Sequence, residues 1–322
     1  AAVSEEFHPG YRNSVASYVV SLLREEVVEE LELRKFGYQT MPLHNAFYPD
    51  LNGEYLLLTE DESQNKAQYA KFSDTDYDAI TAFDEVVDKV GAIIASQWLK
   101  EPPRLYEGGI SDLIAASKLG LDLYHLDNST RHSLLQLFFG APESIIESWF
   151  DSDKVKAVIA SHCMPGNYAS LSQPSAGLAM LHHAVGSLDG KKGVWGLVRG
   201  GMGTITQAMA RSALTKGVEI KTEAPVEKIL LRDGIANGVR LSDGSSLHAR
   251  IIAANTDPKR TFLTLLGKEF LPEKFARDIS AFRQESASLR MNLALSGLPQ
   301  FRCMPGNSIG PQHQSTIVFI QS

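Results

Sequence analysis

The pattern of apolar and polar residues is clearest between residues 196 and 258. After a glycine turn at residues 199–203, apolar or small residues recur every three or four positions from Thr204 to Lys216, which predicts a helix with one buried face. Strands are then predicted at residues 218–221, 226–232, 235–241 and 247–254, with Asp-Gly turns at 233–234 and 243–244. Residues 251–254 are all apolar, which predicts a strand inside a sheet that is covered on both faces.

The residues before this stretch are mostly helical in their pattern. A helix is predicted over residues 25–35, and a long one begins near Asp74 or Asp76 and continues to residue 94. Shorter helices are predicted at residues 111–119, 129–139, 143–150 and 153–162, and another begins at Pro174. Because so many of these helices have an apolar face, we expect a helical cap over a cavity.

Strands are predicted on both sides of the helical region. Residues 55–58 form one, and residues 289–295 and 316–320 form two more near the end of the chain. We expect the last two to pair in one sheet. The fold class expected is therefore α/β (α+β), with two discontinuous domains.

Composition and charge exclude some classes of protein. The chain has 322 residues, of which 43% are hydrophobic and 21% charged, as in ordinary globular proteins. A net charge of −7 argues against nucleic acid as a partner, because phosphate binding needs a clustered basic surface. Cys163 and Cys303 are expected to be buried free thiols in a reducing compartment, and the location expected is cytoplasmic. No apolar run approaches the roughly 18–20 residues of a membrane span.

Several motifs together resemble one family. They are Val194-Trp195-Gly196 with Arg199-Gly200-Gly201-Met202-Gly203, Val226-Glu227-Lys228-Ile229, Asp243-Gly244, Asn255-Thr256-Asp257-Pro258, the first residues of the chain and Leu181-His182-His183. The chain resembles the phytoene dehydrogenase-like FAD-dependent oxidoreductases over its whole length. Within that group it is most similar to the pyridine nucleotide-disulfide oxidoreductase domain-containing protein 2 type.

The resemblance implies a fold, a cofactor and a division of the chain into two domains. Residues 1–44 and 191–261 are expected to form part of a Rossmann-type, doubly wound FAD-binding domain with a small inserted antiparallel sheet. Residues 45–190 and 262–322 are expected to form the substrate domain, a helical cap with its own sheet. Such flavoproteins begin with a strand and a G-x-G-x-x-G turn and end with a glycine-rich segment, and this chain has neither. It is therefore expected to be an internal fragment, which itself binds no FAD and is inactive.

The resemblance also implies site residues, each with a structural alternative. FAD is expected to contact the main chain of Val226, and residues of the ligand-binding edge and of the glycine turn, namely Asn255, Thr256, Gly200, Gly201, Met202 and Ser17. The alternatives are core packing for Val226, helix capping for Asn255 and Thr256, a tight packing turn for the glycines, and a buried join between a turn and a helix for Ser17. His182, Trp195 and Arg199 are expected to line the substrate cavity. The alternatives are a satisfied structural histidine for His182, which its pattern favours, and a solvated loop arginine for Arg199. No catalytic residue is assigned.

Two local alternatives concern other cofactors. Residues 201–206 with Glu223 resemble a nicotinamide-nucleotide fingerprint, but Thr206 replaces the third glycine. His182 and His183 are adjacent and diverge by about 100° on a helix, and no third ligand has metal spacing, so no metal is expected.

The function expected of the whole protein is hydride transfer from an apolar or amine-type substrate to flavin. The alternative is a non-catalytic scaffold that retains the flavoprotein fold. Self-association through exposed apolar surface is expected in either case.

Overall fold

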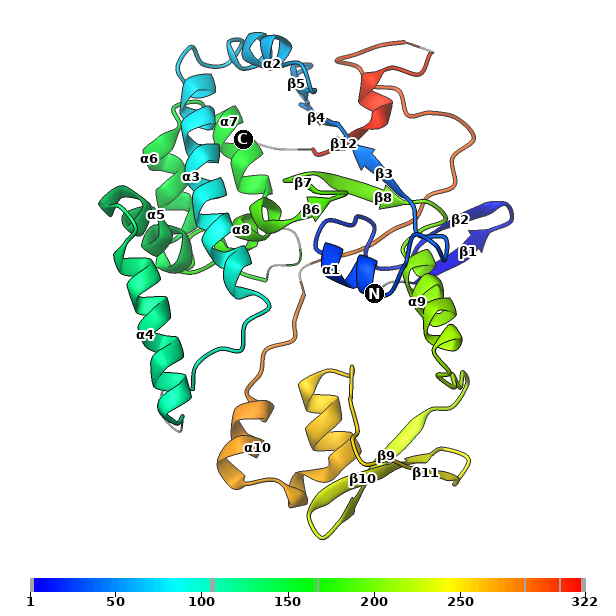
Figure 1. Ribbon diagram of the computed structural model, residues 1–322. Helices are drawn as coiled ribbons and strands as arrows, with labels where there is room; N and C mark the ends of the chain where they lie inside the picture. Colours follow the sequence, from blue (N-terminus) through cyan, green and yellow to red (C-terminus); the bar gives the residue numbers. More distant parts are fainter. Residues whose placement is uncertain are drawn as a thin grey trace. The chain divides into compact units, whose positions relative to one another are not determined.

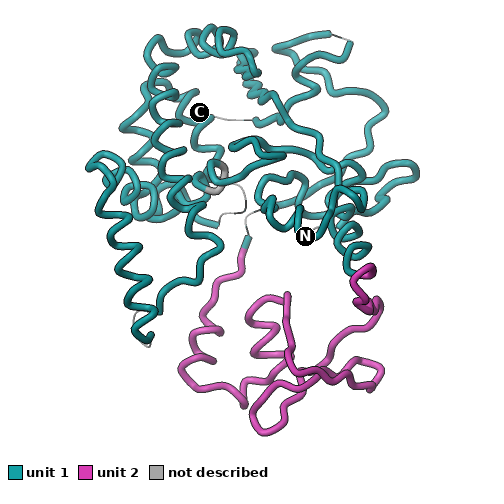
Figure 2. Tube along the Cα trace, in the orientation of Figure 1, with its two compact units in different colours: residues 1–213, 286–322 teal, residues 214–285 magenta. Residues whose placement is uncertain are grey.

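The computed structural model describes residues 3–104, 108–164, 166, 168–286, 288–306 and 308–319, without the side chains of His182 and His183. Contacts divide the chain into two compact units. The first unit comprises residues 1–213 and 286–322, and the second comprises residues 214–285 (Figure 2).

The first unit contains most of the helices. They are α1 (Glu25–Glu30), α2 (Glu62–Tyr69), α3 (Asp76–Gln97), α4 (Ile110–Tyr124), α5 (Asn128–Phe139), α6 (Pro142–Trp149), α7 (Asp153–Ser161), α8 (Leu178–Val185), α9 (Gly203–Thr215), which runs just past the unit boundary, and a short 3₁₀ turn η3 (Pro311–Gln314). Helices are confirmed at every position predicted between residues 74 and 162, although α4 runs five residues past its predicted end. The helix predicted to begin at Pro174 begins instead at Leu178, because residues 174–177 form a turn, and α1 ends five residues before the predicted position because residues 31–37 form turns.

Its strands form several small sheets. They are β1 (Ser4–His8), β2 (Tyr11–Ser14), β3 (Thr40–Leu43), β4 (Asn45–Pro49), β5 (Tyr55–Leu58), β6 (Ser187–Leu188), β7 (Lys191–Lys192), β8 (Trp195–Val198) and β12 (Ser315–Ile317). The sheets are β1-β2, β12-β4-β5, β3-β8 and β6-β7, and only the β12-β4 pairing is parallel. This mixture of helices and small sheets confirms the α/β (α+β) class.

Helix α3 is the centre of the larger core. Ile80, Phe83, Val87 and Val90 recur at helical spacing and are buried, because this face packs against the neighbouring helices. Helices α5, α6 and α8 contact α3, and α7 contacts α6 (Figure 1). The β4-β5 hairpin contributes Tyr48 and Leu56 to the same core.

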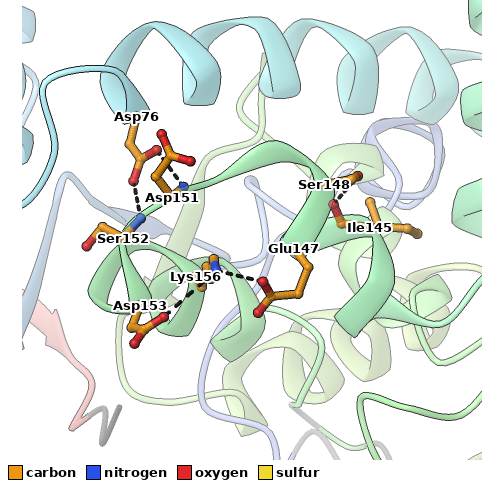
Figure 3. Close-up of polar contacts among 8 residues, drawn as sticks. All are labelled: Asp76, Ile145, Glu147, Ser148, Asp151, Ser152, Asp153 and Lys156. Carbon is orange, nitrogen blue, oxygen red and sulfur yellow. Dashed lines mark hydrogen bonds and ion pairs between the residues drawn. The ribbon is translucent and has the colours of Figure 1, made fainter.

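A buried carboxylate links α3 to α7. Asp76, at the start of α3, is 1% exposed and accepts hydrogen bonds from the backbone N–H groups of Asp151 and Ser152, both at 2.9 Å (Figure 3). Since the first N–H groups of a helix lack partners within it, this carboxylate satisfies backbone donors beside the start of α7.

A second core lies around α9. Val28 and Leu33 pack with Val198 of β8 and with Ile205 and Ala208 of α9, and all five are buried. This core fixes the position of the turn that joins β8 to α9.

The predicted pairing of residues 289–295 with residues 316–320 is wrong. Residues 289–295 form no strand, and β12 pairs with β4 instead. The segment is held by side chains: Arg290 and Asn292 both donate to the Ser14 carbonyl, while Leu289 is 87% exposed. Residues 289–295 therefore have the alternating pattern of a strand but no adjacent strand to pair with.

The second unit is a three-stranded antiparallel meander with short helices. Its elements are β9 (Val226–Arg232), β10 (Ile235–Leu241), β11 (Ser246–His248), a π-helical stretch η1 (Lys259–Gly267), a 3₁₀ turn η2 (Lys268–Phe270) and α10 (Glu273–Ser280). The predicted bounds of β9 and β10 are confirmed, and so is the small antiparallel sheet.

Two strand predictions in this unit are wrong. Residues 218–221 form no strand, and the last strand ends at His248. Ile251, predicted to be buried, is 83% exposed. Among the described residues, no strand lies beside 250–254 to accept its backbone hydrogen bonds, so the apolar run stays extended and unpaired.

The expected division into FAD-binding and substrate domains stays a prediction, because the two units reflect contacts and not cofactor binding. Within the described ranges, no helix combines the length and the apolar character needed to cross a membrane.

Candidate functional site

The turn between β8 and α9 is built from two left-handed glycines. Gly200 has φ of +81° and Gly201 has φ of +82°, a region that side chains with a Cβ rarely adopt. Gly203 is required for a different reason, since a Cβ on it would lie 2.8 Å from the Ser4 nitrogen. The glycine pattern therefore permits a close approach between this turn and the β1-β2 hairpin.

Two serines of that hairpin occupy the start of α9. The N–H of Met202 donates to the Ser14 hydroxyl at 3.0 Å, and the N–H of Gly203 donates to the Ser4 hydroxyl at 2.9 Å. Ser14 is 2% exposed and Met202 is 7% exposed, so this contact is shielded from water. A dinucleotide pyrophosphate would need these same N–H groups. The structure therefore argues against an independent nicotinamide-nucleotide site at residues 201–206.

The chain leaving β2 carries a second group of polar atoms. Ser17, which is half-buried, donates its hydroxyl to the Val19 carbonyl at 3.3 Å. The Arg290 guanidinium lies 4.8 Å from the centre of the Tyr18 ring and donates to the carbonyl of Ser14. Its Nε is buried and has no hydrogen-bond partner among the described residues. A buried donor without a partner is costly, so an acceptor group fits at this point.

Trp195 and Arg199 flank the same turn. Trp195 is half-buried in β8 opposite Leu43, and Gly196 also bridges to Val20. Arg199 is exposed; its N–H donates to the Gln39 carbonyl, and its carbonyl accepts from Thr204. These residues, with Ser17 and the glycines, all lie in the first unit.

Val226, Asn255 and Thr256 lie in the second unit. Val226 is half-buried at the start of β9 and pairs with Leu241. Next to it, the carbonyl of Pro225 accepts the N–H of Ser242 at 2.9 Å. The main chain at this end of β9 is therefore already partly paired.

Asn255 and Thr256 are both exposed, and they do not themselves cap the following helix. Asp257 does so, since its carboxylate accepts the N–H of Arg260 at 2.9 Å. Thr256 lines a cavity of about 440 Å³ with the β9-β10 hairpin and η1, and its hydroxyl lies 2.6 Å from that of Thr261. The helix-capping role that was the alternative for Asn255 and Thr256 is therefore carried out by Asp257.

The side chain of His182 lies outside the described residues, so its expected place in a substrate cavity stays a prediction. The expected roles of Ser17, Trp195, Arg199, the glycine turn, Val226, Asn255 and Thr256 toward FAD or substrate also stay predictions.

Sequence reasoning missed Ser4, Ser14 and Arg290. Ser4 lies 199 positions before the residue that it contacts, and Arg290 lies 276 positions after Ser14. A single serine or arginine in an alternating stretch has no local signature, so only the fold brings them to the turn.

Comparison with known proteins identifies the class. The model of the flavin containing amine oxidoreductases matches residues 31–282, and the chain therefore belongs to this family of flavoproteins.

Relatives within and around this class are more specific. Pyridine nucleotide-disulfide oxidoreductase domain-containing protein 2 of Rattus norvegicus is 33% identical over 332 residues, in a match that covers 98% of this chain and 57% of the relative. A hydroxyneurosporene desaturase of Cereibacter sphaeroides is 42% identical over 76 residues, which are 24% of this chain and 15% of that enzyme. These matches confirm the resemblance stated from the motifs. The chain spans little more than half the length of the first of these relatives.

Among solved structures, a putrescine oxidase variant aligns with a TM-score of 0.49 at 15% identity, over 82% of this chain and 51% of that one. A likeness at this level carries no argument about function.

Proposed function

We propose that the whole protein is an FAD-dependent oxidoreductase that oxidises an apolar or amine-type substrate. The observation that carries the proposal is the family match over residues 31–282. The partial match to a hydroxyneurosporene desaturase and the match to the amine oxidoreductase family support the two substrate classes. The flavin would supply the acceptor for two electrons and a proton, taken from the substrate as a hydride.

The first unit offers one place that fits such a cofactor. The buried Nε of Arg290 lacks a partner among the described residues, and it lies beside the Ser14–Tyr18 segment. A cation at this point would stabilise negative charge on an electron-accepting ring. The proposed role of Arg290 is therefore to donate to the cofactor, while Tyr18 holds the guanidinium in place by a cation–π contact.

The glycine turn has a positioning role in this proposal. Its amide groups donate to Ser14 and Ser4, so the turn fixes the hairpin and the segment that follows it. It does not itself hold phosphate. Ser17, Trp195 and Arg199 lie in the same unit and are further candidate contacts.

The test is flavin content and reduction in the whole protein. We expect flavin absorption bands that bleach anaerobically when an apolar or amine substrate is added. Arg290→Met should lower the flavin content by about tenfold or more, because a buried hydrogen bond from a charged donor is lost. Arg283→Met is the control, since that side chain is 80% exposed, and it should leave the content unchanged. A whole protein that stays colourless after reconstitution with FAD would refute the proposal.

One observation favours the non-catalytic alternative. In the turn that resembles a nucleotide fingerprint, the N–H groups of Met202 and Gly203 already donate to serines of the β1-β2 hairpin. A purely structural turn needs no other partner for these groups. A protein that binds FAD but shows no bleaching with any amine or polyene would support that alternative. For the 322-residue chain alone, we expect no bound flavin after purification.

A further inference from the structure

Helix α4 carries large apolar side chains on a face that the described part of the chain leaves exposed. They lie within about 120° of the helix circumference, and each is between 55% and 80% exposed: Ile110, Leu113, Ile114, Leu121 and Tyr124. On the same face, between these residues, are only Ser117 and Gly120, which are also exposed. Together these residues are called the α4 stripe, and none of them is charged.

The opposite face of α4 is apolar as well. Ala115, Ala116, Leu119 and Leu123 lie on it and are half-buried. One apolar face is enough to attach a helix to its own core, and a helix that is apolar all round is normally buried. Figure 1 shows α4 extending away from the helices around α3. The α4 stripe is therefore a second apolar surface, of the kind that marks a contact with another molecule.

Both ends of the stripe are held in place. At the start of α4, the Asp112 carboxylate accepts the N–H groups of Arg104 at 2.9 Å and of Gly109 at 3.0 Å. At the other end, the Arg131 guanidinium of α5 lies 5.7 Å from the centre of the Tyr124 ring. Because ordered side chains lose less entropy on association, this surface is suited to rigid docking.

The order of large and small residues makes the stripe complementary to itself. Ser117 is its central position. When two copies of α4 pack antiparallel about Ser117, Ile110 meets Tyr124 of the second copy. Leu113 then meets Gly120 of the second copy, so a large side chain faces a small one and the helices can approach closely. Such an interface has a twofold axis at Ser117 and closes at a dimer.

Charge and area favour a second copy as the occupant. A helix that binds a membrane surface is usually rich in Lys and Arg beside its apolar face, whereas α4 has Lys118 against Asp112 and Asp122. Burial of the five large side chains of each copy removes on the order of 1,000 Å² of surface in total, which is the lower limit for a specific interface. The expected dimer is therefore weak, with a dissociation constant in the micromolar range.

We propose that the α4 stripe is a dimer interface, on which the same stripe of a second copy of this chain packs antiparallel. Neither flavin nor substrate takes part in this contact. The dimer can therefore be tested independently of the redox proposal, and either can fail without the other.

The first test is sedimentation velocity of the 322-residue chain over a micromolar concentration series. We expect a reversible monomer–dimer equilibrium. Leu113→Glu should weaken dimerisation at least about tenfold, because each copy would bury a carboxylate without a partner. Leu51→Glu is the matched control, since Leu51 is 87% exposed in the turn between β4 and β5, and it should change the dissociation constant less than about twofold. Urea unfolding verifies that both variants are folded.

A second test examines the register by cross-linking. Ser117→Cys places two thiols across the twofold axis, so mild oxidation should link the two copies covalently. Ser111→Cys is the control, because Ser111 is exposed on the flank of the same helix and outside the stripe. It should give no more linked dimer than the unsubstituted chain, whose free cysteines are Cys163 and Cys303.

Several results would overturn the proposal. These are a monomer at every concentration, equal effects of Leu113→Glu and Leu51→Glu, and equal cross-linking at positions 111 and 117. A whole protein that stays monomeric while the 322-residue chain dimerises would assign the stripe to another segment of the protein. Binding to phosphatidylcholine vesicles that Leu113→Glu abolishes, without dimerisation, would assign it to a membrane surface.

Discussion

The two compact units close the ends of their helices and strands by different means. The first unit has local caps, such as Asp127 at the start of α5, but it also has distant ones: Asp76 binds the backbone of residues 151–152, and Ser14 binds Met202 across 188 positions. In the second unit the corresponding contacts are local. The N–H of Ser242 donates to Pro225, 17 positions away, and Asp257 accepts from Arg260, three positions away.

This difference indicates which caps depend on the folding of the whole unit and which depend only on their own turn. A local cap forms as soon as its own turn forms, whereas a distant cap exists only when two elements have already packed. Substitutions at distant caps should therefore affect folding of the entire first unit. Substitutions in the second unit should have smaller and more local effects.

The largest effect is expected for Asp76→Ala. The carboxylate is 1% exposed and accepts two backbone N–H groups, which would be left buried without partners. We expect the free energy of unfolding of the chain, measured by urea denaturation, to fall by about 4 kcal/mol. Asp74→Ala is the control, because Asp74 is exposed two residues earlier, and it should cost less than about 0.5 kcal/mol. Equal losses in the two variants would show that the distant cap contributes nothing.

The next effect compares two left-handed glycines, one in each unit. A Cβ on Gly201, whose φ is +82°, would collide with the Ser4 hydroxyl, whereas a Cβ on Gly244, whose φ is +85°, would meet open space. Gly201→Ala should therefore cost about 3 kcal/mol, from backbone strain and displacement of the hairpin, while Gly244→Ala should cost about 1 kcal/mol from strain alone. Thermal and urea unfolding of both variants measure the difference. Similar losses at the two positions would mean that the hairpin does not close on the turn.

Local and distant contacts also explain what the sequence could predict. The helix after the glycine turn and strands β9 and β10 depend on spacing and on Asp-Gly turns within a few residues, and these elements were predicted to within a residue. Residues 289–295 and 250–254 have equally clear apolar patterns but form no strands. A strand needs a neighbour as well as a pattern, and the pattern does not specify the neighbour.

The candidate site follows the same rule. Gly200 and Gly201 were recognised from the sequence because a turn with positive φ has a glycine signature. Ser4, Ser14 and Arg290 were not, because they reach the turn from distant segments. The cavity of about 340 Å³ that Asp84 lines was likewise hidden, since its lining comes from β4, β5, α2, α3, α7, α8 and β7.

A smaller effect is expected from the pH dependence of Asp84. Its pKa is raised from 3.8 to about 6 by burial and by Asp88, and the other ionisable groups described around the cavity are Tyr48, Tyr69, His162 and Lys192. Between these two values the folded state binds a proton that the unfolded state has released. The stability that this carboxyl contributes is therefore fully present below about pH 4, and it is lost as the pH rises through about 6.

Removing that carboxyl should reverse the trend. Asp84→Asn should be more stable than the wild-type chain at pH 8, by about 1 kcal/mol or less because solvent screens the partly exposed group. The difference should disappear toward pH 4. Urea unfolding at both pH values measures it, with Glu85→Gln as the matched variant. A stabilisation that is the same at pH 4 and pH 8 would contradict the assignment.

The smallest effect is expected at Ile251. Its side chain is 83% exposed in a segment that pairs with no strand among the described residues, so it contributes little buried area in this chain. Ile251→Asn should change the free energy of unfolding by less than about 0.5 kcal/mol. Ile229→Ala is the contrast: this residue of the same unit is 8% exposed in β9 and should cost about 2 to 3 kcal/mol when truncated. A large loss at Ile251 would show that the apolar run is buried after all, and that the strand predicted from its pattern forms in solution.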